Sequence, residues 1–442
     1  MVRTEYVMPL PEQVTYCMQV LQQAGHRCYG VGGCVRDSLL GLQPHDYDLC
    51  TDASPAQICQ AFSGHRLVRS GEKHGTIGVV LDGEVYEITT FRTEGGYTDS
   101  RHPDWVAFVQ DVEGDLARRD FTVNAMAYDP KEGLVDPWNG RQDLQEKRLR
   151  TVGDPVKRFT EDPLRILRGV RFAVRYGLTP EPETEKAMFG LVKLMDKLAR
   201  ERVMEELCKL LPLVSAGDLV RYAPVILGVI PELKPSMGFD QRTHHHIYDV
   251  YTHTAHVVEN VGQDLALRWA ALLHDVAKPL TFTLDEAGDG HFYGHEEQSA
   301  MLADGILRRL KAPNALRQQV VLLIENHMLP LSADKKLLRR RITKLGFENV
   351  ELLVQLQKAD LIGTGVHQAC EHHAIADLLM QIRQENDCLS LKDLAVKGTD
   401  LLQAGVEPGP RMGQLLQTLL EKVQNEELPN EKNALLAYIQ EK

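Results

Sequence analysis

A glycine pair at the end of a short apolar run constrains this chain more than any other feature. The run Cys28–Val31 predicts a strand, and Gly32 and Gly33 follow it directly. Glycine lacks a Cβ, so a bulky group can approach the backbone at this point. Phosphate fits, because backbone amides at the head of the next helix and the guanidinium of Arg36 can donate hydrogen bonds to it. We therefore expect the glycines, Arg36 and Asp37 to form a nucleotide phosphate site.

Two aspartates, Asp46 and Asp48, follow the glycine pair. On an extended strand their carboxylates would leave the same face, because side chains alternate between faces. Two carboxylates on one face are suitable ligands for Mg²⁺, which prefers oxygen. An Asp-x-Asp alone is more often a solvated loop, and a Gly-Gly pair alone is usually only a turn. Their combination, with an arginine between them, predicts a nucleotide-binding magnesium site in which Asp46 and Asp48 are the catalytic ligands.

This combination resembles the head motif of the class II tRNA nucleotidyltransferases, which include bacterial CCA-adding enzymes and poly(A) polymerases. The resemblance implies an α+β fold, in which a small mixed-sheet head of the polymerase-β-like type is followed by helical domains. It also implies transfer of nucleotides from CTP and ATP to the 3′ end of tRNA, with Mg²⁺ as cofactor. The domains expected from it are a nucleotidyltransferase head at 1–150, a helical neck and body at 151–235, an HD metal-dependent phosphohydrolase-like domain at 236–385 and a tRNA-binding tail at 386–442.

Length and composition agree with a protein of several domains. The chain has 442 residues, 43% of them hydrophobic, which is enough for several cores. No apolar run approaches the ~20 residues that cross a bilayer, and the first residues lack a signal-peptide core, so we expect a soluble protein of the cytoplasm. The eight cysteines form no C-x-x-C pair, which argues against a disulfide frame or a zinc ribbon. Because the net charge is −12, any RNA site must be local.

Local patterns predict further elements of the head. Residues 11–24 carry apolar side chains at helical spacing. Thr76–Leu81 and Glu84–Phe91 have the composition of strands, and Asp82-Gly83 between them predicts a hairpin turn. A glutamate buried in the second strand would need a cation nearby, which makes Glu87 a candidate third carboxylate for the metal. The alternative is an edge-strand glutamate in water.

Two later stretches of the head match the family. Residues 93–104 are polar and glycine-rich and predict a mobile loop, which the family needs for the final adenosine. The loop is not shortened here, which argues modestly against an enzyme that adds only C. Arg118–Ala127 offers cations, an anion and an amide beside apolar residues, a set that can grip phosphate and ribose. The resemblance implies that Arg119 contacts the nucleotide and that residues 136–140 form the turn that closes the head.

The stretch Glu161–Phe172 predicts an amphipathic helix with two stripes. Apolar residues form the stripe that packs, and the presented stripe consists of arginines 165, 168, 171 and 175. Asp162 and Arg165 lie three apart, so we expect them to be neighbours that can accept from and donate to a base edge. Cytosine and adenine both offer an amine beside a ring-nitrogen acceptor, whereas uracil and guanine do not. The resemblance assigns nucleotide binding to Asp162, Arg165, Arg168 and Arg171.

Histidines become dense from about residue 241 onward. An ordered set on predicted helices resembles the HD superfamily of metal-dependent phosphohydrolases, and consists of His253, His274, Asp275, His295, His327 and Asp360. Such ligands suit Mn²⁺, Fe²⁺, Ni²⁺ or Mg²⁺, and two ions could clamp a phosphate and activate water. His256 is an alternative to His253, and residues 244–246 are expected at the surface. The competing interpretation is an HD fold that is only structural.

The last stretch, from residue 391, alternates short helices with glycine turns. A generic helical cap would look similar, but Gly398–Leu401 and Pro429–Lys432 resemble the tail of bacterial CCA-adding enzymes, so the resemblance covers nearly the whole chain. Three alternatives stay open. They are a poly(A) polymerase, an A-adding or CC-adding enzyme of a split pathway, and an HD phosphohydrolase whose head is an RNA-binding module.

Overall fold

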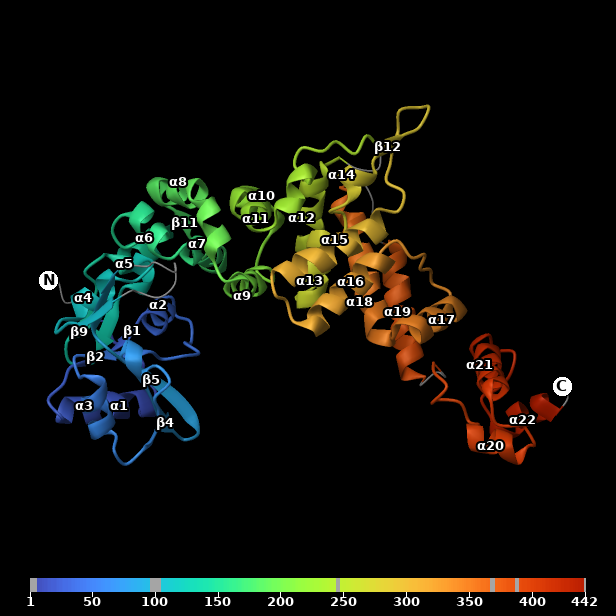
Figure 1. Ribbon diagram of the computed structural model, residues 1–442, viewed down its shortest axis with the longest axis horizontal. Helices are drawn as coiled ribbons and strands as arrows, with labels where there is room; N and C mark the ends of the chain where they lie inside the picture. The colour runs from blue at the N-terminus through green and yellow to red at the C-terminus, as the bar shows by residue number, and fades with distance from the viewer. Residues whose placement is uncertain (1–5, 96–104, 244–246, 366–369, 386–388, 441–442) are drawn as a thin grey trace. The chain divides into compact units, whose positions relative to one another are not determined.

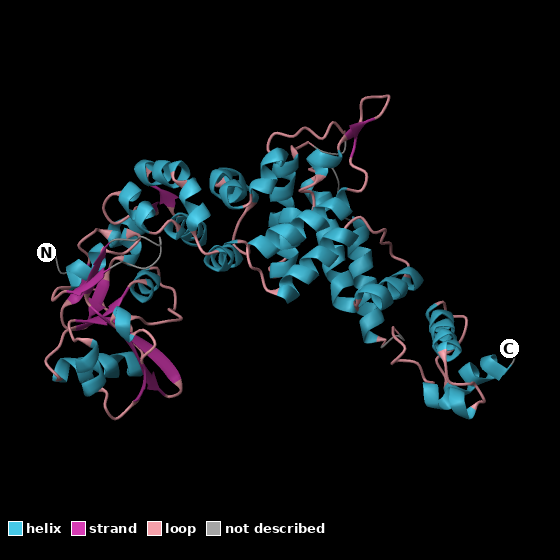
Figure 2. Cartoon of the chain, in the orientation of Figure 1, coloured by secondary structure: helices cyan, strands magenta, loops and turns pink. Residues whose placement is uncertain are grey.

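The computed structural model describes residues 6–95, 105–243, 247–365, 370–385 and 389–440. The chain divides into two compact units, which consist of Met1–Leu213 with Tyr222–Val229 and of Val214–Arg221 with Ile230–Lys442. Nearly all strands lie in the first unit, and helices make up most of the second (Figure 1, Figure 2). The expected α+β class is confirmed. The finer division into four domains stays a prediction.

The first unit contains a mixed seven-stranded sheet in the order β3-β4-β5-β2-β1-β8-β9. Its strands are β1 (Cys28–Val31), β2 (Leu49–Thr51), β3 (Arg66–Val68), β4 (Thr76–Leu81), β5 (Glu84–Thr90), β8 (Ala127–Asp129) and β9 (Gly133–Val135). Strands β2 and β5 are parallel, and every other neighbouring pair in this sheet is antiparallel. The head predicted at the N-terminus is therefore a mixed sheet.

Both faces of the sheet are covered, because successive residues of the central strands are apolar. Cys28 and Leu49 belong to a core with the buried faces of α1 and α3. Their neighbours Tyr29 and Cys50 point to the opposite face, where they pack with Phe91 and side chains of α4. Near-continuous apolar runs are typical of strands buried on both faces. The phosphate-site glycines follow one of these central strands.

The remaining elements of the first unit surround this sheet and extend beyond it. The helices are α1 (Glu12–Gln23), α2 (Gly33–Leu39), α3 (Pro55–Ala61), α4 (Val112–Ala117), α5 (Gly140–Gln145), α6 (Pro155–Glu161), α7 (Leu164–Tyr176), α8 (Pro182–Gly190), α9 (Arg200–Leu210) and α11 (Ala223–Val229), with 3-10 turns η1 (Glu72–His74), η2 (Thr122–Asn124) and η3 (Val192–Lys197). Two small pairs complete it: β6 (Arg92–Gly95) with β7 (Trp105–Phe108), and β10 (Arg148–Leu149) with β11 (Thr179–Pro180).

The second unit is a helical array. Its helices are α10 (Ala216–Arg221), α12 (Val250–Asn260), α13 (Leu265–Leu273), α14 (Lys278–Thr281), α15 (His295–Arg309), α16 (Asn314–Asn326), α17 (Lys335–Leu345), α18 (Phe347–Gly363), α19 (Cys370–Gln384), α20 (Gly398–Gln403), α21 (Pro410–Gln424) and α22 (Lys432–Gln440), with η4 (Pro231–Ser236) and the pair β12 (Thr283–Leu284) and β13 (Gly290–His291). Helices α17, α18 and α19 share one core, and α21 and α22 share another. None of the described helices has the length and apolar character that a membrane span requires.

Several local predictions for the head are confirmed. The first helix spans Glu12–Gln23, and the hairpin strands end within one residue of their predicted limits. Asp82 and Gly83 both have positive φ, 51° and 87°, as a two-residue turn with the twist of a hairpin requires. These elements depend on neighbouring residues alone, so the sequence predicts them well.

Three expectations for the head are wrong in detail. Asp46 and Asp48 lie in the segment before β2, which begins at Leu49, so they are not on a regular strand. Glu87 is exposed, so it does not need a cation to compensate for burial. Its strand β5 lies between β4 and β2, so it is not an edge strand either. The first residues of the expected loop 93–104 belong to β6, and residues 96–104 lie outside the described residues.

Candidate active site and metal centre

The contact between Gly32 and Arg119 defines the head site. Gly32 has φ +76° and precedes helix α2, and a Cβ at this position would stand 2.7 Å from Nη1 of Arg119. Only glycine combines this backbone conformation with this close approach. Arg119 itself is held by Asp115, whose Oδ2 lies 3.4 Å from Nη2, while its buried Nε has no hydrogen-bond partner. The guanidinium thus lies against the glycine turn with one donor available.

The two head aspartates are near this guanidinium. Desolvation by the surrounding protein raises the pKa of Asp48 above its usual range. The positive charge of Arg119 opposes this shift, whereas the negative charge of Asp46 adds to it. Both carboxylates are accessible at the surface. The amide of Val31 donates to the carbonyl of Asp48 at 3.0 Å, which ties the aspartate segment to β1. A pair of neighbouring, accessible carboxylates suits Mg²⁺, which is commonly held by one or two carboxylates together with substrate phosphates and water.

Arg36 has a different environment from the one expected. Its guanidinium is buried, donates to Asp37 at 2.8 Å and to the side chain of Asn124, and lies 4.3 Å from the ring centroid of Tyr176. These contacts fix α2 to the segment after Arg119 and to α7. A phosphate contact by Arg36, Asp37 or Gly33 stays a prediction.

The arginine stripe of α7 is less exposed than predicted. Arg165 and Arg171 are buried, and each pairs with a carboxylate: Arg165 with Glu161 at 2.9 Å and Arg171 with Glu206 at 2.7 Å. Charged side chains at this depth need such partners, because an unpaired buried charge is strongly unfavourable. These two arginines therefore form ion pairs inside the first unit.

Arg168 pairs with Asp120, the residue after Arg119. It donates from Nε at 3.0 Å and from Nη2 at 2.7 Å to the same carboxylate oxygen. The other oxygen accepts from the side chain of Asn124 at 3.0 Å. Burial alone would raise the pKa of Asp120, but Arg168 and the hydrogen bonds hold it well below its usual range. The head motif and the α7 motif are thus parts of one buried network.

Asp162 is positioned by a residue that the sequence did not indicate. It lies between α6 and α7, and its carboxylate accepts from the amide of Leu164 at 3.1 Å. Its ion pair is with Arg202 of α9, at 2.9 Å. Arg165, its expected neighbour, pairs with Glu161. Asp162 and Arg165 still lie at the start of the same helix.

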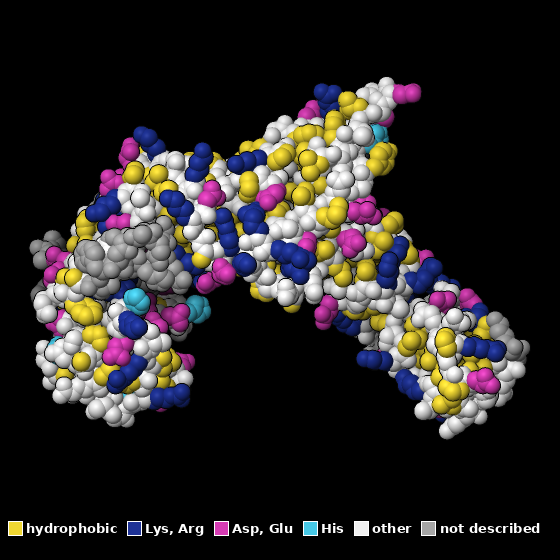
Figure 3. Space-filling view, in the orientation of Figure 1, with side chains coloured by type: hydrophobic (Ala, Val, Ile, Leu, Met, Phe, Trp, Pro, Cys, Tyr) yellow, Lys and Arg dark blue, Asp and Glu magenta, His cyan; other side chains and the backbone are white. Residues whose placement is uncertain are grey.

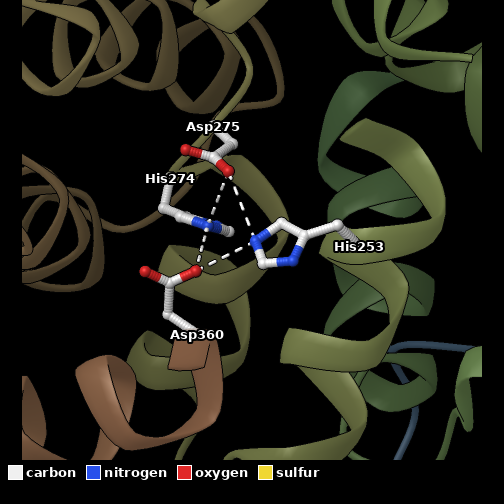
Figure 4. Close-up of side chains that lie close together, drawn as sticks. All are labelled: His253, His274, Asp275 and Asp360. Atoms are coloured by element: carbon white, nitrogen blue, oxygen red, sulfur yellow. Dashed lines mark ion pairs between the residues drawn. The ribbon is translucent and has the colours of Figure 1, made fainter. Parts of the chain in front are cut away.

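A second cluster lies in the second unit, at the positions predicted for an HD site. His253 from α12 and Asp360 from α18 point toward the His274-Asp275 pair after α13 (Figure 4). Nε2 of His253 lies 2.9 Å from Asp360 and 3.4 Å from Asp275. Nε2 of His274 lies 3.1 Å from Asp275. His256, the alternative to His253, instead stacks on Tyr248 and is outside the cluster.

Two groups of potential ligands share Asp275. The first consists of His253, His274, Asp275 and Asp360, and the second of Asp275, His295 and His327, and within each group the ligand atoms lie within 4.8 Å of one another. A shared carboxylate between two such groups is an arrangement suited to two metal ions. Among the residues that the structure describes, groups of three or more such side chains are found only here.

The histidines are oriented as metal ligands. Nδ1 of His274, His295 and His327 lies 2.8, 2.8 and 2.6 Å from a backbone carbonyl three residues earlier. A carbonyl can only accept, so each Nδ1 carries the proton and each Nε2 presents a lone pair to the cluster. Neither carboxylate oxygen of Asp275 accepts a hydrogen bond of good geometry, although the residue is buried. Carboxylate oxygens that lack aligned donors and face imidazole nitrogens fit a divalent ion.

The charges of the cluster support this interpretation. Burial would lower the pKa of His274, but Asp275 and Asp360 raise this pKa to about 10. For His327, burial and the charge of His274 lower the pKa to about 4. The carboxylates thus attract positive charge to the imidazoles, and a divalent ion would compete with a proton for Nε2. Lys278, not predicted as a site residue, adds a charge 2.8 Å from Asp275. A cavity of about 640 Å³ opens beside the cluster.

Comparison with known proteins identifies the family. The family model described as "Poly A polymerase head domain" matches residues 28–150. A second model, described as "Probable RNA and SrmB- binding site of polymerase A", matches residues 177–216. A third model, of a tRNA nucleotidyltransferase domain 2, matches residues 296–439. The chain is 34% identical to the CCA-adding enzyme of Levilactobacillus brevis, over 97% of this chain and 98% of the relative. The chain belongs to the CCA-adding enzyme family.

Two further relatives agree with membership of the CCA-adding enzyme family. The Lactiplantibacillus plantarum CCA-adding enzyme is 33% identical over 95% of this chain and 94% of its own length. The crystal structure of the Bacillus stearothermophilus CCA-adding enzyme in complex with CTP matches 98% of both chains with a TM-score of 0.72 and 28% identity. The chain is therefore a tRNA nucleotidyltransferase, and its acidic and histidine groups imply the use of divalent metal ions.

Sequence reasoning missed three residues that contact the predicted sites. Arg202 and Glu206 lie on α9, 40 and 35 residues after Asp162 and Arg171, and no local pattern connects them. Lys278 could have been found, because it lies three residues after Asp275 and faces it in an i,i+3 relationship. The other residues predicted for the second unit come together as expected.

Proposed function

We propose that this member of the CCA-adding enzyme family adds C and A from CTP and ATP to the 3′ end of tRNA, using Asp46 and Asp48 as magnesium ligands. Template-independent CCA addition and repair is the activity of the family to which the full length of the chain belongs. The solved relative that binds CTP supports CTP as a substrate. The packing of Gly32 against Arg119 beside Asp48 carries the assignment of the site. The cytoplasmic location inferred from the sequence is part of this proposal.

The residues of the head have distinct tasks in this proposal. Bound by Asp46 and Asp48, magnesium ions would lower the pKa of the RNA 3′-hydroxyl and neutralise the pyrophosphate as it leaves. Gly32 leaves space for the guanidinium of Arg119, which donates to the triphosphate. Asp115 holds the guanidinium of Arg119, and Arg168 holds the adjacent residue Asp120. Catalysis then consists mainly of positioning and of stabilising negative charge.

Base selection is assigned to the start of α7. Asp162 can accept from the exocyclic amine that cytosine and adenine share, and Arg165 can donate to the neighbouring ring nitrogen. Arg202 orients the Asp162 carboxylate through their ion pair. Arg168 and Arg171 are proposed to support the nucleotide from the next turns of the helix. Uracil and guanine present the opposite donor and acceptor order, so they should be rejected.

A primer-extension assay tests these assignments. Purified tRNA that lacks CCA is offered with each nucleoside triphosphate separately and with CTP and ATP together, and the 3′ ends are sequenced. We expect C and A to be incorporated and Asp46→Ala to abolish incorporation, while Glu113→Ala, which removes an exposed charge of the same head, leaves it unchanged. Equal incorporation of U and G would contradict the base-reading assignment.

The same sequenced products separate the remaining alternatives. Addition that stops after CCA identifies the complete activity. Addition of C alone or of A alone would identify an enzyme of a split pathway, and long A tracts would identify a poly(A) polymerase. These outcomes differ in the product and do not depend on which residues bind the nucleotide.

A metal-dependent phosphohydrolase activity is the second candidate function, and the paired ligand groups around Asp275 favour it. The proposed ligands are the six residues of the two groups, and the ions are Mn²⁺, Fe²⁺, Ni²⁺ or Mg²⁺. We expect hydrolysis of p-nitrophenyl phosphate or bis-p-nitrophenyl phosphate after addition of one of these ions, and its loss in the His274→Ala, Asp275→Ala double variant. CCA addition should survive in this variant. If CCA addition were lost and hydrolysis retained, the assignment of the two activities to the two units would be wrong.

A further inference from the structure

Helix α17 differs in charge from the rest of this acidic chain. It carries six cationic side chains in eleven residues and no carboxylate, at Lys335, Lys336, Arg339, Arg340, Arg341 and Lys344. Elsewhere on the visible face, Lys and Arg side chains are interspersed with Asp and Glu (Figure 3). Like charges on one helix repel one another, so these cations are stabilised either by carboxylate partners or by a bound anion.

Two of the cations have structural partners. Lys335 pairs with Glu385 after α19, and the largely buried Arg339 pairs with Glu426 at 2.8 Å and donates to the carbonyl of Gln424 at 3.2 Å. These contacts attach α17 to α19 and to the end of α21. Lys335 and Arg339 therefore have structural roles, and Arg341 is half-buried with an unpartnered Nε.

Three other cations form a line on the outer face. Lys336, Arg340 and Lys344 are exposed and lie four residues apart, so their stems follow one side of the helix at intervals of about 6 Å. In the described part of the second unit, none of the three has an ion pair with a carboxylate. Glu426 and Glu427 feel the charge of Lys336, but their own ion pairs are with Arg339 and Lys422. We call these three residues the α17 ridge.

A polar hollow lies beside the ridge. Its volume is about 580 Å³, and it is lined by Arg340, Thr343 and Lys344 of α17 and by Gln417, Glu421, Gln424 and Asn425 at the end of α21. Glu421 is the single carboxylate in this lining, and the other α21 groups are amides that both donate and accept. Cations beside amides can bind phosphate oxygens and sugar hydroxyls together.

We propose that the α17 ridge binds the sugar–phosphate backbone of the tRNA substrate. This inference rests on the proposed function, which supplies a polyanionic substrate. Successive phosphates of a helical RNA strand have a spacing comparable with that of the ridge, and lysine and arginine are the usual phosphate contacts. Backbone contacts carry no base information, which suits an enzyme that must accept tRNAs of different sequence. The ridge is a local cationic site of the kind that a chain of net charge −12 needs for RNA.

A triple variant tests the ridge. Lys336→Gln, Arg340→Gln and Lys344→Gln are combined, and the dissociation constant for tRNA lacking CCA is measured by filter binding at several salt concentrations. We expect affinity to fall by about tenfold or more and the slope of log affinity against log salt to decrease by about two to three. The KM for tRNA should rise in parallel, while kcat at saturating tRNA and the KM for CTP stay unchanged.

A matched control has the same charge change at cations that already have partners. Arg308, Arg383 and Lys209 pair with carboxylates at 2.7, 2.9 and 2.6 Å, so their combined substitution by Gln should change the salt slope little. An unchanged affinity and slope in the ridge variant would overturn the proposal, and so would an equal loss in the control. If the unmodified chain bound tRNA but added no nucleotide, the proposed function would fail and the binding assay would still decide the ridge.

Discussion

Arg168 donates two hydrogen bonds to one carboxylate oxygen of Asp120, at 3.0 and 2.7 Å. Asp120 follows Arg119, the residue that lies against the glycine turn, and Arg168 is on the helix that begins beside Asp162. The contact therefore joins the side of the site assigned to phosphate to the side assigned to the base. Because it is buried and charge-assisted, the two sides are held as one rigid piece.

Asp120→Asn should destabilise the first unit. Removing the charge leaves Arg168 without its carboxylate, which costs about 3–5 kcal/mol for a buried pair. The pKa of Asp120 is lowered in the folded state, so its contribution is present above the unfolded pKa of about 3.9 and is lost as the pH falls through the folded pKa. Urea unfolding followed by fluorescence should show a large difference from wild type at pH 7 and a smaller one below pH 3.

Asp196→Asn is the control for this comparison. Asp196 is exposed and lies 3.9 Å from Arg200, so the free energy of unfolding should change by no more than about 0.5 kcal/mol. A difference for Asp120→Asn that stayed constant between pH 7 and pH 3 would show that the lost charge is not its cause.

Gly32→Ala should reduce kcat/KM for CTP by about two orders of magnitude, because the new Cβ would displace the guanidinium of Arg119. Gly41→Ala separates this effect from backbone strain. Gly41 also has a positive φ, +71°, but has open space around its Cβ position. Steady-state kinetics on tRNA lacking CCA give the comparison. Similar losses in both variants would mean that strain, and not the contact with Arg119, causes the defect.

Arg202→Ala should weaken base selection more than turnover. Without its ion pair Asp162 can rotate, so we expect the ratio of kcat/KM for CTP to that for UTP to fall by about tenfold. Arg202→Lys, which keeps the charge, should recover part of the ratio. Arg200→Ala changes a neighbouring arginine that pairs with the exposed Asp196, and it should leave selection intact. A loss of kcat with unchanged selection would contradict the positioning role.

His253→Ala should lower the amount of divalent metal that copurifies with the protein, whereas His256→Ala should not. His253 lies 2.9 Å from Asp360 within the cluster, and His256 has its ring on Tyr248, with centroids 4.5 Å apart. Metal content measured by mass spectrometry after reloading with Mn²⁺ decides between them. Equal metal content in wild type and His253→Ala would remove this residue from the ligand set.

Local features of the chain were predictable from sequence. The strand before Gly32, the first helix and the hairpin at Asp82-Gly83 follow from apolar spacing and from residues that tolerate positive φ. The histidine set of the second unit was also predictable, because ligand types in a fixed order imply a common cluster. In each case the information lies within a few residues or in a known motif.

Tertiary structure decided which charges face water and which face one another. The alternation of stripes on α7 predicted a presented row of arginines, yet Arg165 and Arg171 are buried, because α9 brings Glu206 and Arg202 to this helix from some forty residues away. Likewise, the position of Asp46 before β2, and not on it, depends on how the strands pair. The spacing of apolar and polar residues along an element indicates its two faces. Only tertiary packing determines what covers each face and which partner neutralises each charge.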